Sequence, residues 1–242
     1  MPEIAESSIV LFLILFQSIF GVGLLMFGTP TFIILGYSFP ETLALLLPIS
    51  LSISALQFFL STEKNKIFLF NFNLFCIPFL IIFLYVALTF HQIINFKLYT
   101  SLIIIFFSIV SLSQVKFIYK SKINKIAERI ILILIGIIHG LTNLGGSLLA
   151  IFSTIISSSN KNLSRYFISY GYMIMSFIQI LILFFFEKEY FNVKSFYYII
   201  AVFILYFPIQ KIFQKFNNKK FSKIINIIAL IYGLSILGNS FF

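Results

Sequence analysis

The apolar segment 130–158 most limits how this chain can fold, because it is hydrophobic at both ends and polar in the middle. Its centre, 139–147, reads HGLTNLGGS and combines glycines with hydrogen-bonding side chains. Both features disfavour an uninterrupted helix, and each apolar arm is shorter than the roughly 20 residues that a full crossing needs. A broken backbone survives within a membrane only where it is buried in protein or lines a watery cavity. We therefore expect a broken helix whose break lies at a binding site.

The composition indicates that this segment belongs to a membrane protein. With 60% hydrophobic residues, 10% charged residues and a mean hydropathy of +1.08, the chain lies far outside the composition of soluble domains, in which about 25% of residues are charged. The net charge of +10 does not predict a nucleic-acid partner, because the basic residues lie between apolar spans, where they orient a protein against anionic lipid. We expect an all-α, multi-pass protein of the bacterial cytoplasmic (inner) membrane.

The apolar segments are predicted to form two repeats. A shift of 122 residues (139 minus 17) places Gln17 on His139, Gly23 on Gly145 and Gln57 on Gln179. Two glycine-broken segments at matching places in two halves are typical of repeat-built transporters, although chance similarity between apolar sequences is the alternative. The first predicted repeat, 1–117, has a broken segment at 8–38 and spans at 41–60, 67–88 and 98–116. A basic linker follows at 118–129. The second predicted repeat, 130–242, has a broken segment at 130–158 and spans at 163–186, 193–211 and 221–240.

The positions of the basic residues predict how the segments cross. If every segment crossed fully, the 17 Lys and Arg would divide almost evenly between the two faces, contrary to the positive-inside bias. If segment 130–158 enters and leaves on one face, all but three of the 17 share a face, the exceptions being Lys97, Lys188 and Lys194. We therefore expect a re-entrant hairpin there. Residues 1–60 contain no Lys or Arg, so for the first hairpin only the repeat favours re-entry, and a full crossing stays open. With two re-entrant hairpins, each repeat has three transmembrane helices, the repeats are inverted, and both termini face outward.

The predicted site is formally neutral, because all acidic and basic residues fall in loops or at span ends. Two broken helices that point their N-termini at one place would offer unpaired N–H groups and partial positive charge to a small anion. Each candidate also has a purely structural explanation. The histidine can bond to a carbonyl of the broken helix, the glutamines and serines can contribute to helix packing, and the polar residues in the breaks can cap loosened backbone. Tyr170 and Tyr172 are weaker candidates. The predicted substrate-binding residues are Gln17, Gly21, Gly23, Thr29, Ser54, Gln57, His139, Thr142, Asn143, Gly145, Gly146, Ser147, Ser176 and Gln179.

The glycine-rich segments also carry a family resemblance. The stretches 17–30 (QSIFGVGLLMFGTP), 46–50 (LLPIS) and 140–147 (GLTNLGGS) resemble the paired motifs of the sulfite exporter TauE/SafE family, also called the toluene sulfonate uptake permease family. The resemblance implies a permease for small sulfur-containing anions such as sulfite, thiosulfate or organosulfonates. Many members carry a fuller glycine run, whereas here the first copy continues with two leucines after Gly23 and the second begins with Asn143. The identity of the substrate therefore does not carry over.

We expect a secondary transporter of small sulfur-containing anions that works by alternating access around the two broken helices. Its expected partners are the anion, protons or another coupling ion, membrane lipid and a second copy of the chain. We expect no cofactor, metal or catalytic residue, because two His, one Cys and no Asp are poor material for an enzyme. A non-transporting assembly or scaffold subunit is the main alternative, and a membrane-embedded enzyme is a weaker one.

Overall fold

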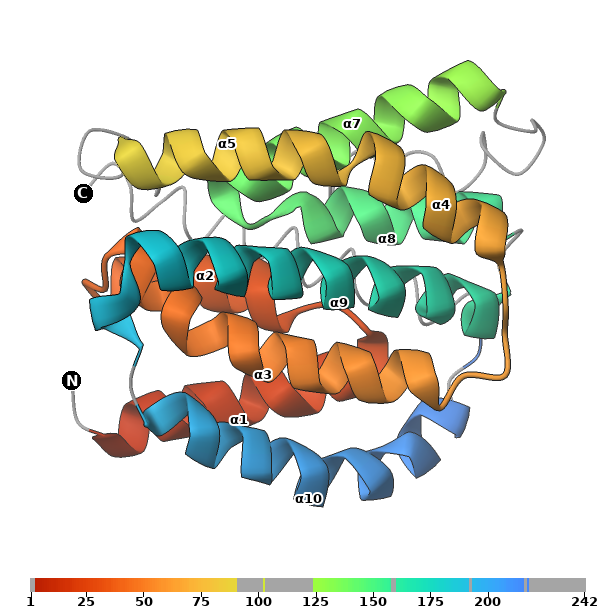
Figure 1. Cartoon of the computed structure of the whole chain (residues 1–242). Coiled ribbons are helices and arrows are strands. Elements are labelled where there is room, and N and C mark those ends of the chain that lie inside the picture. The colour runs from red at the N-terminus through yellow and green to blue at the C-terminus, as the bar shows by residue number, and fades with distance from the viewer. Residues whose placement is uncertain are drawn as a thin grey trace.

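The computed structural model describes residues 3–90, 102, 124–157, 160–191, 193–215 and 217, and this part of the chain is helical, without strands (Figure 1). The all-α prediction is confirmed there, while the predicted spans 98–116 and 221–240 lie outside these residues. The elements are α1 (Glu3–Phe20), α2 (Leu24–Ile34), α3 (Phe39–Phe59), α4 (Lys66–Phe75), α5 (Ile77–Thr89), α7 (Lys125–Thr142), α8 (Gly145–Ile156), α9 (Lys161–Phe186), the short 3-10 helix η2 (Lys188–Tyr190) and α10 (Lys194–Lys215).

Long apolar helices agree with the expected membrane protein. Among the described residues, four helical stretches are long and apolar enough to cross a membrane: Phe39–Phe59, Lys66–Thr89, Lys161–Phe186 and Lys194–Lys215. The helices α1, α2 and α8 are apolar but shorter. In the second of the four stretches, α4 and α5 meet at Cys76, two residues before Pro78. Proline lacks a backbone donor and crowds the preceding turn, which explains the interruption there.

Polar residues at the helix starts set where the long helices begin. The Ser38 hydroxyl accepts from the backbone N–H of Glu41, whose carboxylate accepts from the Ser38 N–H in return. At the starts of α4, α7 and α9, the side chains of Asn65, Asn124 and Asn160 likewise accept hydrogen bonds from backbone N–H groups of the first turn. Because such caps satisfy N–H groups that have no partner within the helix, each of these starts is encoded locally in the sequence.

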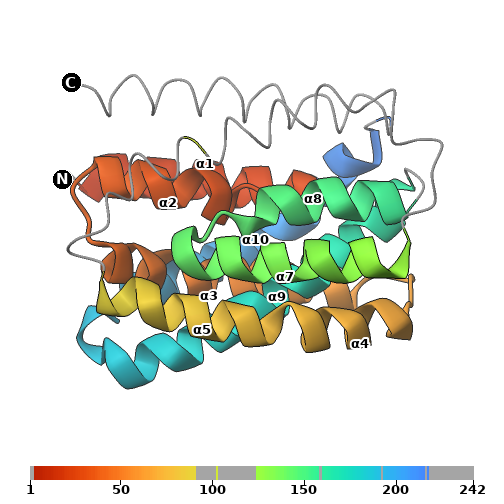
Figure 2. The same cartoon turned by 90° about the horizontal axis from the view of Figure 1, so that it is seen from above.

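Two pairs of helices fold back on themselves and approach each other from opposite ends of the molecule (Figures 1 and 2). We call α1 and α2, with the turn 21–23, hairpin 1, and α7 and α8, with Asn143 and Leu144, hairpin 2. In Figure 1, α1 runs from left to right and α2 returns to the left, whereas α7 runs from right to left and α8 returns to the right. The turns of both hairpins therefore lie inside the bundle.

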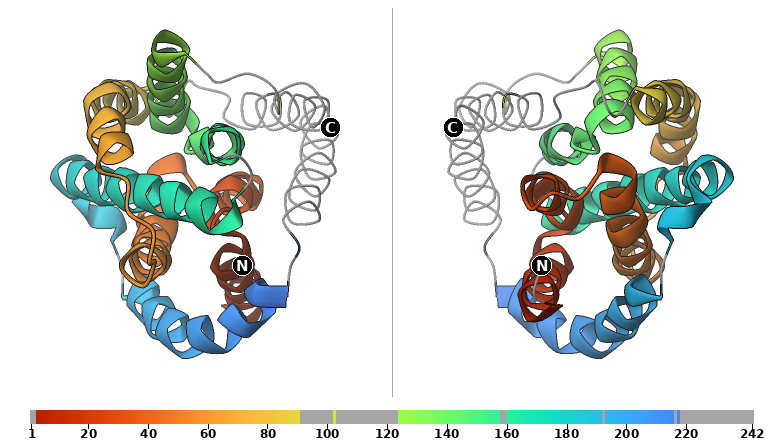
Figure 3. Two further views of the ribbon diagram at one scale, coloured as in Figure 1. Left: turned by 90° about the vertical axis from the view of Figure 1, so that its right-hand side faces the viewer. Right: turned by 90° about the vertical axis from the view of Figure 1, so that its left-hand side faces the viewer.

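The antiparallel helices α3 and α9 pack against each other in the middle of the molecule (Figure 1). Hairpin 1 packs against α3 and α10, and hairpin 2 packs against α5 and α9. Seen from its ends, the bundle shows most helices along a common direction (Figure 3). A continuous apolar core joins them, so that the turns of the two hairpins are held by helices from both halves of the chain.

Candidate functional site

The turns of the two hairpins depend on residues that tolerate left-handed backbone. Gly21 and Gly23 have φ angles of 77° and 129°, and Asn143 has a φ of 62°. Most residues with a Cβ avoid this region, and asparagine is one of the few that enter it readily. The helices α1 and α7 therefore end where the sequence analysis placed their breaks.

Hairpin 2 touches hairpin 1 directly through two predicted site residues. The Asn143 Nδ2 donates a hydrogen bond of 2.9 Å to the Thr29 hydroxyl in α2, and both residues are fully buried. The Asn143 Oδ1 atom is buried without a partner. The turn of hairpin 2 thus lies against the middle of α2, and it keeps a free polar atom.

Around hairpin 1 several predicted site residues hydrogen-bond to one another. The Gln17 amide nitrogen lies 3.2 Å from the Ser50 hydroxyl and 3.1 Å from the Ser54 hydroxyl, to which it donates. The Gln17 Oε1 accepts from the N–H of Leu24, the first residue of α2, at 3.2 Å. The Gln57 Nε2 donates to the Gln17 carbonyl oxygen at 2.9 Å. Gln17 therefore caps α2 from the preceding helix and uses up its own hydrogen-bonding groups in doing so.

The matching position in hairpin 2 is His139, which makes a different contact. Its Nε2 lies 3.1 Å from the Gln179 Oε1, and its ring meets the Tyr172 ring edge-on at 6.0 Å between centroids. Its Nδ1 is buried without a partner. If the Gln179 amide turns over and donates to Nε2, the neutral ring carries its proton on Nδ1. His139 then offers a buried donor without carrying a charge.

The N-terminus of α8 is buried and uncapped, unlike that of α2. Leu144, the residue before α8, supplies no side-chain cap. The N–H groups of Gly145 and Gly146 have no acceptor within the described part of the chain. Because a buried helix end needs partners for these groups, a ligand is one way to satisfy them.

The side chains at this helix end also have unused polar atoms. The Tyr172 residue is fully buried, its hydroxyl has no partner, and a Cβ added at Gly146 would overlap that hydroxyl. Glycine at 146 thus lets the hydroxyl lie against the first turn of α8. Apart from the Ser153 hydroxyl further along α8, the buried side-chain atoms without a partner in hairpin 2 or on the α9 residues facing it are His139 Nδ1, Asn143 Oδ1, Tyr172 OH, Ser176 Oγ and Gln179 Nε2.

Three other predicted site residues have local roles. The Thr142 hydroxyl donates to the Ile138 carbonyl at 2.7 Å and accepts from the Leu144 N–H at 3.3 Å. The Ser147 hydroxyl donates to the Leu144 carbonyl at 2.9 Å. Gly145 packs against α7, where an added Cβ would lie 2.6 Å from the His139 Cβ. These residues shape the turn of hairpin 2, which agrees with the structural reading of its threonine and serine.

The prediction that no fixed charge lies near the breaks is wrong for hairpin 1. Arg165 was assigned to a span end, yet its side chain is only 9% exposed. Its Nη2 donates to the Ser18 carbonyl at 3.3 Å and to the Tyr206 hydroxyl at 3.2 Å. A long side chain near the start of α9 therefore reaches the end of α1, which the position of its backbone alone does not suggest.

Glu6 is a second charged residue that proves to be buried, at 3% exposed. Its carboxylate accepts from the Tyr37 hydroxyl at 2.7 Å, from the Tyr198 hydroxyl at 3.3 Å and from the Lys194 ammonium at 3.4 Å. In the loop after α2, burial and the hydrogen bond to Glu6 raise the pKa of Tyr37. The cluster ties the open end of hairpin 1 to α10 and is internally satisfied.

Two residues that contact the predicted site residues, Ser50 and Tyr172, were not in the predicted set, although Tyr172 was a weaker candidate. The 122-residue shift pairs them, because 50 plus 122 is 172, and each contacts the residue at the matching position of its hairpin: Ser50 meets Gln17, and Tyr172 meets His139. Extending the shift to every polar residue of α3 would have found both.

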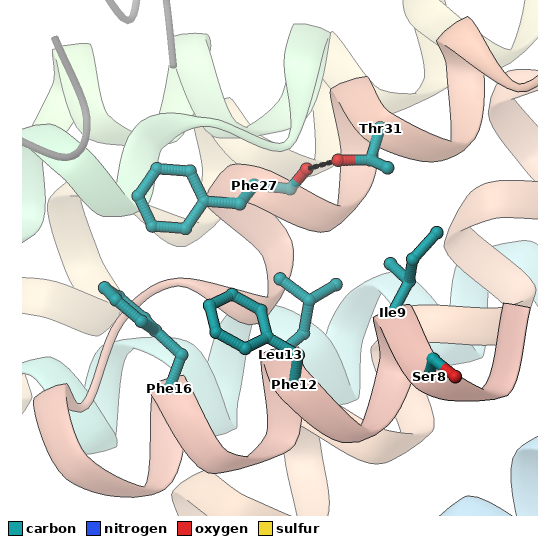
Figure 4. Close-up of a pocket in the computed structure, with 7 residues that line it drawn as sticks. All are labelled: Ser8, Ile9, Phe12, Leu13, Phe16, Phe27 and Thr31. Atoms are coloured by element: carbon teal, nitrogen blue, oxygen red, sulfur yellow. Dashed lines mark hydrogen bonds between the residues drawn. The ribbon is translucent and has the colours of Figure 1, made fainter. Parts of the chain in front are cut away.

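A cavity of about 380 Å³ lies between the arms of hairpin 1, away from the polar atoms described above (Figure 4). It contains none of the predicted site residues, and its Thr31 hydroxyl already donates to the Phe27 carbonyl at 2.6 Å. It therefore offers an anion little to bind. Its lining residues are Ser8, Ile9, Phe12, Leu13, Phe16, Phe27 and Thr31.

Comparisons of this chain with protein-family models, with curated proteins and with solved structures find no match.

Proposed function

We propose that this protein is a secondary membrane transporter that binds a small oxyanion at the N-terminus of α8. The observation that carries the proposal is the group of unused polar atoms there. Two backbone N–H groups, and one polar side-chain atom each of His139, Asn143, Tyr172, Ser176 and Gln179, have no partner within the described part of the chain, and all of these side-chain atoms are buried. Each buried, unsatisfied polar group costs about 1–3 kcal/mol, so a ligand that satisfies several of them at once is strongly favoured.

The chemistry of these groups suits an anion. The tyrosine and serine hydroxyls and the backbone N–H groups donate, and so does either the Gln179 amide nitrogen or the His139 Nδ1, according to which way the Gln179 amide faces. The Asn143 Oδ1 only accepts, while the N-terminal end of α8 adds roughly half a positive charge. In contrast, the N-terminus of α2 is already occupied by the Gln17 side chain. We therefore assign the anion to hairpin 2, with the Asn143–Thr29 contact joining this site to hairpin 1. The resemblance to the TauE/SafE family favours sulfur oxyanions such as sulfite, thiosulfate or sulfonates.

An inverted repeat is part of the proposal, and the helix bounds support it. Adding 122 to the bounds of α1, 3 and 20, gives 125 and 142, which are the bounds of α7. The same shift carries the N-cap Ser38 of α3 onto the N-cap Asn160 of α9. It also superposes the identical residues Ile4, Ala5 and Glu6 on Ile126, Ala127 and Glu128.

The direction of the helices and the distribution of charge support opposite orientations for the two repeats. Hairpin 1 opens toward one end of the bundle and hairpin 2 toward the other (Figure 1). The starts of α4, α7 and α9 and the end of α10 share the right-hand end in that view. We assign this end to the cytoplasm because basic residues gather there: Lys66, Lys125, Arg129, Lys161, Arg165, Lys211 and Lys215.

Alternating access follows from this arrangement. The anion would lie where the two hairpins meet, and movement of one repeat against the other would open the site toward one face at a time. The Glu6 cluster lies at the opposite end, where it holds hairpin 1 to α10. Breaking that cluster is therefore a candidate step in outward opening.

A screen of anions by thermal unfolding of the detergent-purified protein tests the proposed function. Ligand that binds the folded state raises the unfolding temperature by mass action. We expect stabilisation by thiosulfate, sulfite or methanesulfonate and little by chloride at equal ionic strength. A scaffold subunit would show no difference between these anions, and that result would contradict the proposal.

A further inference from the structure

Arg165 presents a buried positive charge to the turn of hairpin 1, on the side of the molecule where the basic residues gather. Its guanidinium carbon lies 4.2 Å from the centre of the Phe213 ring in α10. Its two hydrogen bonds, to the Ser18 carbonyl and the Tyr206 hydroxyl, both come from Nη2. Within the described residues no carboxylate contacts it. A buried charge without a counter-charge costs several kcal/mol, so this position favours a negative partner.

The unused polar atoms around this guanidinium are mainly donors. Arg165 Nε and the Ser18 hydroxyl are both buried without partners, and so is the Gln57 Oε1. A Cβ added at Gly21 would lie 3.6 Å from the Arg165 Cγ and 3.7 Å from the Gln57 Oε1, at ordinary contact distance. The turn of hairpin 1 therefore leaves space for a methyl group beside these atoms, whereas an added Cβ at Gly145 or Gly146 in hairpin 2 would overlap its neighbours.

We propose that Arg165 forms a second anion position, distinct from the α8 site, at the turn of hairpin 1. Its ligand is a small oxyanion, which the guanidinium Nε–H and the Ser18 hydroxyl hold on the cytoplasmic side of the α8 site. The inference rests on the proposed function. The second position would be the last that an anion occupies before release to the cytoplasm, or the first that it occupies on entry from the cytoplasm. It also supplies the fixed charge that the α8 site lacks.

A purely structural role for Arg165 makes a different prediction. The Ser18 carbonyl also accepts from Gln57 Nε2 at 3.3 Å and from Gln210 Nε2 at 3.4 Å. Arg165 would then only complete a cap on the negative end of α1. Loss of Arg165 would loosen hairpin 1 and weaken the binding of all anions by the same factor, whatever their charge.

The test compares two anions of fixed but different charge, thiosulfate (−2) and methanesulfonate (−1), in the full-length purified protein. Coulomb energy is proportional to the ligand's charge, so the factor lost for the divalent anion is roughly the square of the factor lost for the monovalent one. In Arg165→Gln we expect methanesulfonate to bind about tenfold more weakly and thiosulfate to bind about a hundredfold more weakly. Lys211→Gln is the matched control, because it removes one exposed charge from the end of α10 that carries Phe213. It should change both affinities by less than about twofold.

Arg165→Lys keeps the charge and covers the case in which the glutamine variant does not fold. It should retain most of the preference for thiosulfate, because the ammonium still attracts the divalent anion more strongly. Equal weakening of both anions in Arg165→Gln, or unchanged affinities in that variant, would overturn the second anion position. If the glutamine variant does not fold, loss of the thiosulfate preference in Arg165→Lys would overturn it instead. If the wild-type protein binds neither anion, the proposed function itself fails, which separates the two outcomes.

Discussion

Replacing Tyr172 by phenylalanine should make the ligand-free protein more stable and the anion complex weaker. The Tyr172 hydroxyl is fully buried, has no partner and lies against Gly146 at the uncapped start of α8. Without ligand this hydroxyl only carries its desolvation cost. With an anion bound, we expect it to donate a hydrogen bond to an oxygen of the ligand.

The two effects have estimable sizes and opposite signs. Removing a buried hydroxyl that has no partner should raise the unfolding free energy by about 1–3 kcal/mol. Losing a hydrogen bond to a charged group should reduce the binding free energy by about 1.5–3 kcal/mol. The second value corresponds to a roughly 10- to 150-fold higher Kd. A residue with only a packing role cannot produce both changes together.

Thermal unfolding without ligand and titration calorimetry with thiosulfate measure the two quantities on the same preparations. Tyr170→Phe provides the matched control, because the Tyr170 hydroxyl lies on the same helix and donates to the Asn73 Oδ1 at 3.0 Å. That variant should lose about 1 kcal/mol of stability and keep the wild-type affinity.

The reasoning about Tyr172 would be refuted by a phenylalanine variant that is less stable than wild type and binds thiosulfate equally well. Such a result would mean that the hydroxyl has a partner in the folded protein and none in the ligand. A variant with raised stability and unchanged affinity would show that the Tyr172 hydroxyl does not bind the anion at the start of α8.

Three further predictions concern the hairpin turns and the topology. Gly21→Ala should lower the unfolding free energy by roughly 1–2 kcal/mol, because the φ of 77° is strained for alanine, whereas Gly21→Asn should cost less; equal losses in thermal unfolding would argue against backbone strain. If protonation of His139 couples anion binding to protons, thiosulfate affinity measured between about pH 5.5 and 8 should rise as the pH falls in wild type and stay flat in His139→Gln; equal slopes would make His139 a structural residue. Single-cysteine labelling should place positions 122 and 161 on the cytoplasmic face and Lys188 outside, and opposite faces for 122 and 161 would exclude the re-entrant hairpin 2.

The broken helices were predictable because their signals are local. Gly21 and Gly23 stop α1, and Asn143 stops α7, through backbone angles that these residue types favour. The asparagine and serine caps are local in the same way. The start of α7 was placed too late, at 130 rather than at Lys125, because the basic residues there read as a linker although the Asn124 cap already marks a helix start.

The side-chain partners were less predictable because they depend on packing between distant helices. Gln17 and His139 hold matching positions in the repeat, but the sequence does not reveal that Gln17 caps the next helix, α2, while His139 leaves the next helix, α8, uncapped. Arg165 was placed at a span end and its charge was not expected near a break, since only the placement of α1 and α10 reveals where its side chain ends. Both differences distinguish the two hairpins, and neither follows from the repeat.

Uptake of radiolabelled thiosulfate into proteoliposomes tests the central claim most directly. The account predicts saturable uptake in wild-type vesicles that unlabelled methanesulfonate inhibits and chloride does not. In Tyr172→Phe vesicles, half-saturation should shift to roughly 10- to 150-fold higher concentration. Uptake no greater than in protein-free vesicles, together with no thermal stabilisation by any of the sulfur oxyanions, would contradict the claim that this chain carries small oxyanions.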